Sequence, residues 1–184
     1  MKKVYIVHGY GASPDSHWFP WLANQVKINK NIEVMCVPLP NPETPKLSEW
    51  LAALDQHTPS LDEDSYFVAH SLGAITLLRF LHDRQETIGG LLLVSGFTNS
   101  LSRLPQLDAF TVDQLNFSTL RNLSKQSIVI AAKDDTIVPY TETALLAEKL
   151  AATLITLEHG GHFLKEDGFV EFPVAYEQLR QILE

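Results

Sequence analysis

Short apolar runs alternate with longer helical patterns along this chain, and that alternation restricts the fold more than any other feature of the sequence. The apolar runs are continuous, as expected for strands that are covered on both faces of a sheet. Strands that alternate with helices predict a parallel sheet with right-handed crossovers and helices on both sides. The predicted strands cover 3–8, 32–38, 65–70, 90–96, 127–132 and 153–158, and the predicted helices cover 18–29, 47–57, 72–84, 141–151 and 172–183.

The interval 97–126 departs from this alternation, because it carries polar residues, Pro105 and scattered leucines. We expect a short irregular excursion and one helix there, at the edge of the sheet. No internal repeat, low-complexity tract or linker divides the sequence. The 184 residues are therefore predicted to form one α/β domain, 1–184, a three-layer α/β/α sandwich around a mostly parallel six-stranded sheet.

The net charge and the single cysteine restrict the partners and the environment of the protein. A formal net charge of −8 is unfavourable for binding nucleic acid or anionic membranes, since both require a basic surface. The lone Cys36 cannot form an internal disulfide and fits a reducing compartment. The apolar stretch after Lys3 ends at His8, too early for an export signal, and no window approaches the roughly 20 apolar residues of a membrane span. We expect a cytoplasmic protein without nucleic-acid or membrane partners.

Polar residues follow four of the predicted strands at the point where each strand ends. The carboxyl ends of parallel strands lie at one edge of a sheet, where the loops of α/β proteins place their functional groups. The sequence therefore predicts a reactive group of side chains at this edge. The residues are His8 to Gly11 after the first strand, Ser71 after the third, Asp134 and Asp135 after the fifth, and His159 and His162 after the sixth.

The stretch Ala69-His70-Ser71-Leu72-Gly73 fits the G-x-S-x-G nucleophile elbow, with alanine in place of the first glycine. A tight turn from strand to helix would project the Ser71 hydroxyl from the sheet, and the small residues Ala69 and Gly73 would allow helix and strand to approach closely. The helix N-terminus would then offer the Leu72 N–H to a developing oxyanion. The alternative for Ser71 is a helix N-cap, a common role of serine.

A nucleophilic serine needs a base, and the base needs an orienting carboxylate. On the fold that carries such elbows, these groups follow in the order serine, acid, histidine. The segment AAKDDTIVPY (131–140) places two aspartates after the fifth strand, and EHGGHFL (158–164) places histidine on a glycine-rich turn after the sixth. The order matches, and it leaves two candidates for the acid and two for the base.

Taken together, these segments resemble the α/β-hydrolases, and more narrowly the small lidless serine hydrolases of the YdeN and retinoblastoma-binding-protein-nine type. The matching segments span nearly the whole chain in the order of that family. The resemblance implies a minimal lidless α/β-hydrolase fold and a serine hydrolase that needs no metal or organic cofactor. The segments are HGYGAS, HWFPWL, LPNPETPKLSEWL, AHSLGA, KDDTIVPY and HGGHFLKEDGF.

The resemblance also implies an acid and a base. Asp135 lies four residues before Pro139, as the acid does in the hydrolase pattern D-x-x-[VL]-P, and Asp134 is the alternative, otherwise a turn or cap residue. The histidine of the family follows glycine at the tip of its loop, which implies His162 as the base. His159 lies nearer the strand and is the alternative base. A metal-binding H-x-x-H pair is the other interpretation of the two histidines, but no further ligand set accompanies them.

The remaining implied site residues bind substrate. Tyr10 lies after the first strand, where this fold supplies its second oxyanion donor, so its N–H is expected to act with that of Leu72. Trp18, in the aromatic segment SHWFPWL, is expected to contact substrate, although aromatic residues at such spacing also occur in cores. A phosphate-binding loop is the alternative for HGYGAS, but the segment lacks both G-x-G-x-x-G and the lysine of a P-loop.

The function that follows is hydrolysis of small carboxylic esters, with amides as a second substrate class, through an acyl-enzyme on Ser71. The alternative is a catalytically silent interaction module that keeps the fold and binds a protein partner, since fold alone does not determine function. A third interpretation keeps the serine and changes the reaction to that of a lyase, acyltransferase or peroxidase. Retention of all three reactive groups at the strand ends favours an enzyme.

Overall fold

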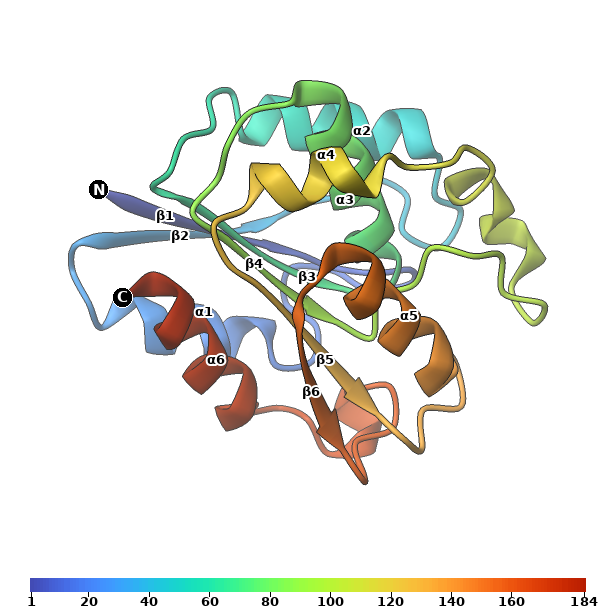
Figure 1. Ribbon diagram of the computed structural model, residues 1–184. Helices are drawn as coiled ribbons and strands as arrows, with labels where there is room; N and C mark the ends of the chain where they lie inside the picture. The colour runs from blue at the N-terminus through green and yellow to red at the C-terminus, as the bar shows by residue number, and fades with distance from the viewer.

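The computed structural model describes residues 1–184 and has a six-stranded sheet at its centre, in the order β2-β1-β3-β4-β5-β6 (Figure 1). All neighbouring strands are parallel, which confirms the predicted sheet. None of the helices has the length and apolar character needed to cross a membrane. The strands are β1 (Lys2–Val7), β2 (Ile32–Val37), β3 (Ser65–His70), β4 (Gly90–Val94), β5 (Ser127–Ala132) and β6 (Thr153–Leu157).

Helices cover both faces of the sheet, and each face has its own hydrophobic core (Figure 1). The helices α2, α3, α4 and α5 pack on one face, whereas α1 and α6 pack on the other. The predicted three-layer α/β/α sandwich is thereby confirmed. The helices are α1 (Phe19–Lys27), α2 (Leu47–His57), α3 (Leu72–Arg84), α4 (Phe117–Leu123), α5 (Tyr140–Leu150) and α6 (Pro173–Leu183), with the short 3₁₀ helices η1 (Pro105–Phe110) and η2 (Lys165–Asp167).

The strands differ in how fully they are covered. Every residue of β3 and β4 is buried, as the continuous apolar runs predict. In β2, buried or half-buried residues alternate with exposed ones, and β6 is also partly exposed. The reason is position, because β2 and β6 form the two edges of the sheet.

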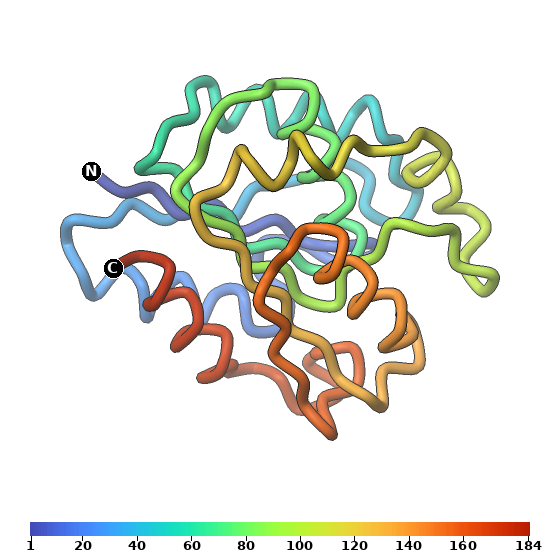
Figure 2. Tube along the Cα trace, in the orientation of Figure 1, coloured from blue at the N-terminus to red at the C-terminus, as the bar shows by residue number.

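The segment between β4 and β5 lies in the helical layer and not at the edge of the sheet, where the sequence placed it. It contains η1 and α4, and α4 packs between α3 and α5. The buried Arg79 of α3 holds the segment, because its Nε donates to the Phe110 carbonyl at 2.5 Å and its Nη2 to that of Asp113 at 2.7 Å. Figure 2 shows this segment in yellow-green, extending to one side before it returns as α4.

The sheet order reverses at β1, and this reversal positions the site. The chain passes from β1 to β2 on one side and then to β3 on the other, so that Val7 pairs with both Val37 and Ala69. The loops after β1 and β3 therefore leave the sheet side by side. In open α/β sheets such a switch point is where ligands bind.

Candidate active site

Ser71 occupies the sharp turn between β3 and α3. It has φ 55° and ψ −123°, a strained conformation for a residue other than glycine. Ser71 stands at the N-cap position of α3, but its side chain makes no capping hydrogen bond. The alternative of a plain helix cap is therefore wrong, and the hydroxyl is free to bond elsewhere.

Gly73 explains how the turn can be so tight. A Cβ atom at this position would lie 2.4 Å from the carbonyl oxygen of His8 and 2.8 Å from that of Val7. Both oxygens belong to the backbone at the end of β1, which cannot move away easily. The first turn of α3 can lie directly against this strand end only because residue 73 has no side chain.

The structure brings Ser71, His162 and Asp135 together, although they come from three separate loops. His162 Nε2 lies 2.9 Å from Ser71 Oγ, and His162 Nδ1 lies 2.8 Å from Asp135 Oδ2. An ionised carboxylate only accepts hydrogen bonds, so Nδ1–H donates to Asp135 and Nε2 accepts from the Ser71 hydroxyl. Both the histidine and the aspartate side chains are buried, 6% and 2% exposed, so water competes little for these bonds.

The carboxylate of Asp135 has every lone pair engaged. Its Oδ1 accepts the backbone N–H groups of Ile137 and Val138, each at 2.9 Å, and its Oδ2 accepts the Ser95 hydroxyl at 2.9 Å in addition to His162. These four hydrogen bonds fix the orientation of the carboxylate. Sequence reasoning missed Ser95 because it placed this residue inside the fourth strand. The strand in fact ends at Val94, so the rule that polar residues follow strands would have found it.

Asp134 contacts the same loop in a different way. Its Oδ1 accepts the N–H groups of Gly160 and Gly161 at 2.9 and 2.8 Å, and its Oδ2 lies 3.3 Å from His159 Nδ1. The Gly161 hydrogen bond is the largest cause that lowers the pKa of Asp134. The His159 ring is 92% exposed and points to a different carboxylate from that of His162. No group of three or more His, Cys, Asp or Glu side chains is arranged to hold a metal ion.

The backbone of the histidine loop, residues 158–168, is tied down on both sides of His162. Asp167 Oδ2 accepts the N–H groups of His162 at 2.9 Å and Leu164 at 3.0 Å. The ring of His70 bonds the His162 carbonyl, with 2.8 Å between Nε2 and the oxygen. Phe163 has φ 58°, a conformation that persists only because its surroundings fix it.

Trp18 is not positioned to contact a substrate, in contrast to the sequence-based expectation. Its side chain has no exposed surface, and its indole N–H donates to the Phe163 carbonyl at 3.1 Å. Its ring also packs edge-on against Phe172 at 5.4 Å. An aromatic-rich segment does not indicate which of its rings faces solvent, and in this segment the ring of Trp18 is buried in the hydrophobic core. Trp18 thus supports the histidine loop from the buried side, through its hydrogen bond to Phe163.

The two predicted oxyanion donors are among the backbone N–H groups around Ser71 that have no acceptor within the protein. The two donors are those of Leu72, the first residue of α3, and Tyr10, in the loop after β1. The two loops touch, because a Cβ atom at Gly9 would lie 3.0 Å from the Cβ of Ser71 and 3.6 Å from the Leu72 nitrogen. The N–H groups expected to bind an oxyanion are therefore both unpaired, and they lie at the start of α3 and in the neighbouring loop after β1.

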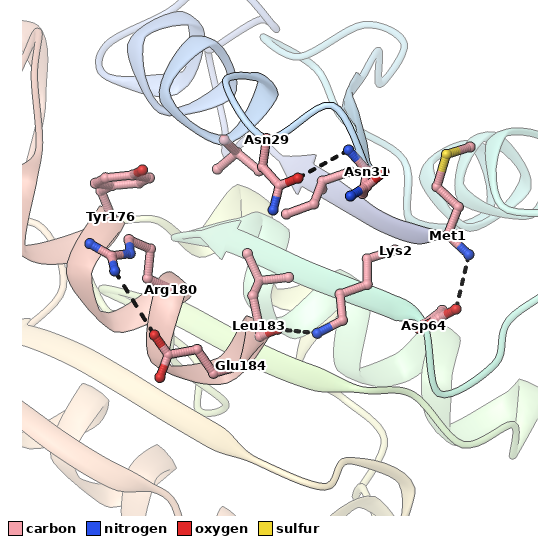
Figure 3. Close-up of a pocket in the computed structure, with 11 residues that line it drawn as sticks. Met1, Lys2, Asn29, Asn31, Asp64, Tyr176, Arg180, Leu183 and Glu184 are labelled. Carbon is pink, nitrogen blue, oxygen red and sulfur yellow. Dashed lines mark hydrogen bonds and ion pairs between the residues drawn. The ribbon is translucent and has the colours of Figure 1, made fainter.

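A cavity of about 510 Å³ lies at the opposite end of the sheet (Figure 3). Lys2 at the start of β1 donates there to the Leu183 carbonyl at the end of α6, and Arg180 pairs with Glu184 at 3.9 Å. None of the candidate site residues lines this cavity. It is therefore separate from the group around Ser71.

Comparisons with known proteins identify the family to which the chain belongs. A family model described as serine hydrolase matches residues 4–181. The chain is 42% identical to the YdeN protein of Bacillus subtilis over 180 residues, which cover 97% of this chain and 94% of YdeN. It is also 25% identical over 164 residues to the serine hydrolase RBBP9 of Rattus norvegicus, covering 88% of this chain and 87% of that protein.

Solved structures show the same fold. The crystal structure of the Bacillus subtilis ydeN gene product superposes with a TM-score of 0.95 and 41% identity, over 99% of this chain and 98% of that one. Est1E from Butyrivibrio proteoclasticus, solved with ferulic acid bound, has a TM-score of 0.75 at 15% identity, over 100% of this chain and 90% of that one. At that identity the likeness concerns the fold alone.

Proposed function

The chain belongs to the serine hydrolase family, and from that premise we propose that it hydrolyses small carboxylic esters, with amides as a second class, through an acyl-enzyme on Ser71. One observation carries the proposal, the pair of hydrogen bonds that links Ser71 through His162 to Asp135. A serine hydroxyl becomes an effective nucleophile when a base removes its proton, and this pairing supplies both the base and its orienting carboxylate.

In the first step, His162 Nε2 takes the proton from Ser71 Oγ as that oxygen attacks the carbonyl carbon of the substrate. Asp135 accepts the Nδ1–H bond, which keeps Nε2 free to accept, and its charge stabilises the imidazolium that forms. The carbonyl oxygen becomes an oxyanion, and the N–H groups of Tyr10 and Leu72 are the proposed donors to it. Each such donor is worth about 2.7–4 kcal/mol in comparable enzymes.

The tetrahedral intermediate then breaks its bond to the leaving alcohol, which receives the proton from His162. A water molecule attacks the acyl-enzyme by the same route, and His162 takes the proton of the water. The bond between the acyl carbon and Ser71 Oγ breaks, which releases the carboxylic acid and returns the proton to the serine. Esters are the first class proposed because an alkoxide is a better leaving group than an amide anion, so the nitrogen of an amide substrate must be protonated before its C–N bond can break.

A fluorophosphonate probe and a panel of activated short-chain esters test the proposal. We expect one labelled residue in the wild-type protein, no labelling of Ser71→Ala, and ester turnover reduced by about 10⁶-fold in that variant. Labelling that persists in Ser71→Ala would remove Ser71 from the proposed role. A wild-type protein that neither reacts with the probe nor hydrolyses any ester would favour the silent interaction module.

A further inference from the structure

His70, the residue before Ser71, has a hydrogen-bonding pattern that packing does not explain. Its ring is buried, and its Nε2 lies 2.8 Å from the carbonyl oxygen of His162. A carbonyl oxygen can only accept, so Nε2 carries the hydrogen and donates it. The other ring nitrogen, Nδ1, is then a buried acceptor, and no donor in the protein reaches it.

An unpaired buried nitrogen is unfavourable, and the surroundings of His70 offer no compensation through packing. The neighbouring rings form an aromatic pocket in which a phenylalanine would leave no ring nitrogen unpaired. A histidine in this place therefore needs a reason other than core packing. The rings, with their centroid distances to His70, are those of His17 at 6.0 Å, Trp18 at 6.0 Å, Phe19 at 5.9 Å and His162 at 4.8 Å.

We propose that His70 is a positioning residue, whose Nε2–H bond to the His162 carbonyl aims the His162 ring at Ser71 and Asp135. Asp167 holds the N–H of His162 from one side and His70 holds its carbonyl from the other, so both peptide planes that flank its Cα are fixed. The orientation of the His162 ring then depends only on the torsion angles of its own side chain. The inference rests on the proposed role of His162 as the base.

His70 stays neutral while His162 is protonated and deprotonated during the reaction. Burial is the largest cause that keeps the pKa of His70 well below its usual value, and the positive charges that His162, His17 and His8 can carry lower it further. The backbone hydrogen bond to His162 acts in the opposite direction but does not outweigh burial. When His162 takes the proton of Ser71, His70 therefore adds no second charge beside the imidazolium.

Three substitutions separate positioning from packing. The side-chain amide nitrogen of glutamine matches ring Nε2 in reach, whereas that of asparagine matches Nδ1, so only His70→Gln can still donate to the His162 carbonyl. His70→Phe keeps a ring and loses the donor. We expect kcat for an activated ester to fall about 10- to 100-fold in His70→Phe and His70→Asn, with KM nearly unchanged, and to be largely restored in His70→Gln.

Thermal unfolding of each variant reports whether it is folded, and His82→Gln on the outer end of α3 is the matched control with unchanged kcat. Equal kcat in the Gln and Asn variants, both folded, overturns the proposal, as does wild-type kcat in a folded Phe variant. If His70→Phe does not fold, the comparison of Gln with Asn decides alone.

A signal that does not depend on turnover separates this inference from the proposed function. The downfield proton resonance of the His162 Nδ1–H bond to Asp135 reports the ring position directly. We expect it to shift or broaden in His70→Asn and to stay near the wild-type position in His70→Gln. A wild-type protein without esterase activity would contradict the proposed function, yet this resonance would still decide the role of His70. If the resonance has the same position and width in His70→Asn and His70→Gln, the proposed positioning role of His70 is wrong.

Discussion

Asp134 and Asp135 are neighbours in the chain, yet their carboxylates hold different parts of the same loop. Asp135 binds the ring of His162, whereas Asp134 binds the backbone N–H groups of Gly160 and Gly161 just before it. One carboxylate thus orients the proposed base, and the other fixes the chain that carries it. Their adjacency couples the end of β5 to the histidine loop through two independent contacts.

The first prediction concerns these two aspartates. Asp135→Asn should lower kcat by about 10⁴-fold, because an amide can donate to Nδ1 and favour the wrong tautomer of His162. Asp134→Asn should have a far smaller effect, since the amide oxygen can still accept both glycine N–H groups. Steady-state hydrolysis of an activated ester checks both values. The reverse ranking would transfer the role of the acid to Asp134.

A second prediction concerns Ser95, whose hydroxyl donates to Asp135 Oδ2 from a fully buried position. Ser95→Ala removes one of the four hydrogen bonds that the carboxylate accepts. Hydrogen bonds to charged groups contribute about 1.5–3 kcal/mol, so a loss of about tenfold or more in kcat is expected. If Ser95 acts through Asp135, the two substitutions should not be additive. If the fold-loss of kcat in the double variant equals the product of the losses in Ser95→Ala and Asp135→Asn, the two residues are not coupled and the prediction is wrong.

A third prediction follows from the pKa of His70, which burial lowers well below its usual value. An unfolded histidine binds a proton near pH 6.5, whereas the folded chain keeps His70 neutral to a lower pH. The unfolded state therefore binds more protons in this window, and stability is lost as the pH falls below about 6.5. One such group contributes up to about 1.4 kcal/mol per pH unit to the slope.

Urea unfolding of the wild type and of His70→Gln between about pH 7 and pH 5 measures this slope. The variant should lose stability less steeply as the pH falls, whatever its stability at neutral pH, because its amide does not titrate. His8 and His17 also have lowered pKa values, with burial as the largest cause, so a residual slope should remain in the variant. Equal slopes in the two proteins would show that His70 does not take up a proton on unfolding.

The main features of the fold were predictable because they depend on local patterns. The apolar runs and the helical spacing predicted the positions of all six strands and of five of the six α-helices, and the elbow around Ser71 needs only five consecutive residues. The segment 97–126 was harder, because its place depends on Arg79, a residue far earlier in the chain that binds the carbonyls of Phe110 and Asp113. No local pattern around Arg79 or within 97–126 indicates that this side chain binds those carbonyls.

The supporting contacts of the candidate site were not predictable for a related reason. His70, Trp18 and Asp167 all bind backbone atoms of the histidine loop, and a backbone atom has no sequence signature. Whether a side chain reaches it depends on the loop conformation, which includes positive φ angles at Gly161 and Phe163. The sequence indicates which groups react, whereas the folded loop decides which groups hold them in place.

The last prediction concerns Gly161, where conformation and contact can be separated by a matched control. Gly161 has φ 53°, and a Cβ atom there would lie 2.6–2.8 Å from the carboxylate of Asp167. Gly168 also has a positive φ, 94°, but a Cβ atom there would meet nothing within 4 Å. Gly168→Ala should therefore lower the free energy of unfolding only by the cost of placing alanine in a left-handed backbone conformation, about 1–2 kcal/mol.

Gly161→Ala should carry a similar backbone cost and should also push the Asp167 carboxylate away from the N–H groups of His162 and Leu164. We expect kcat to fall at least tenfold in Gly161→Ala and to stay within about twofold of wild type in Gly168→Ala, although both lose thermal stability. Ester hydrolysis and thermal unfolding of the two variants provide the comparison. Equal losses of kcat would mean that backbone strain alone, and not the carboxylate contact, controls the position of the histidine loop.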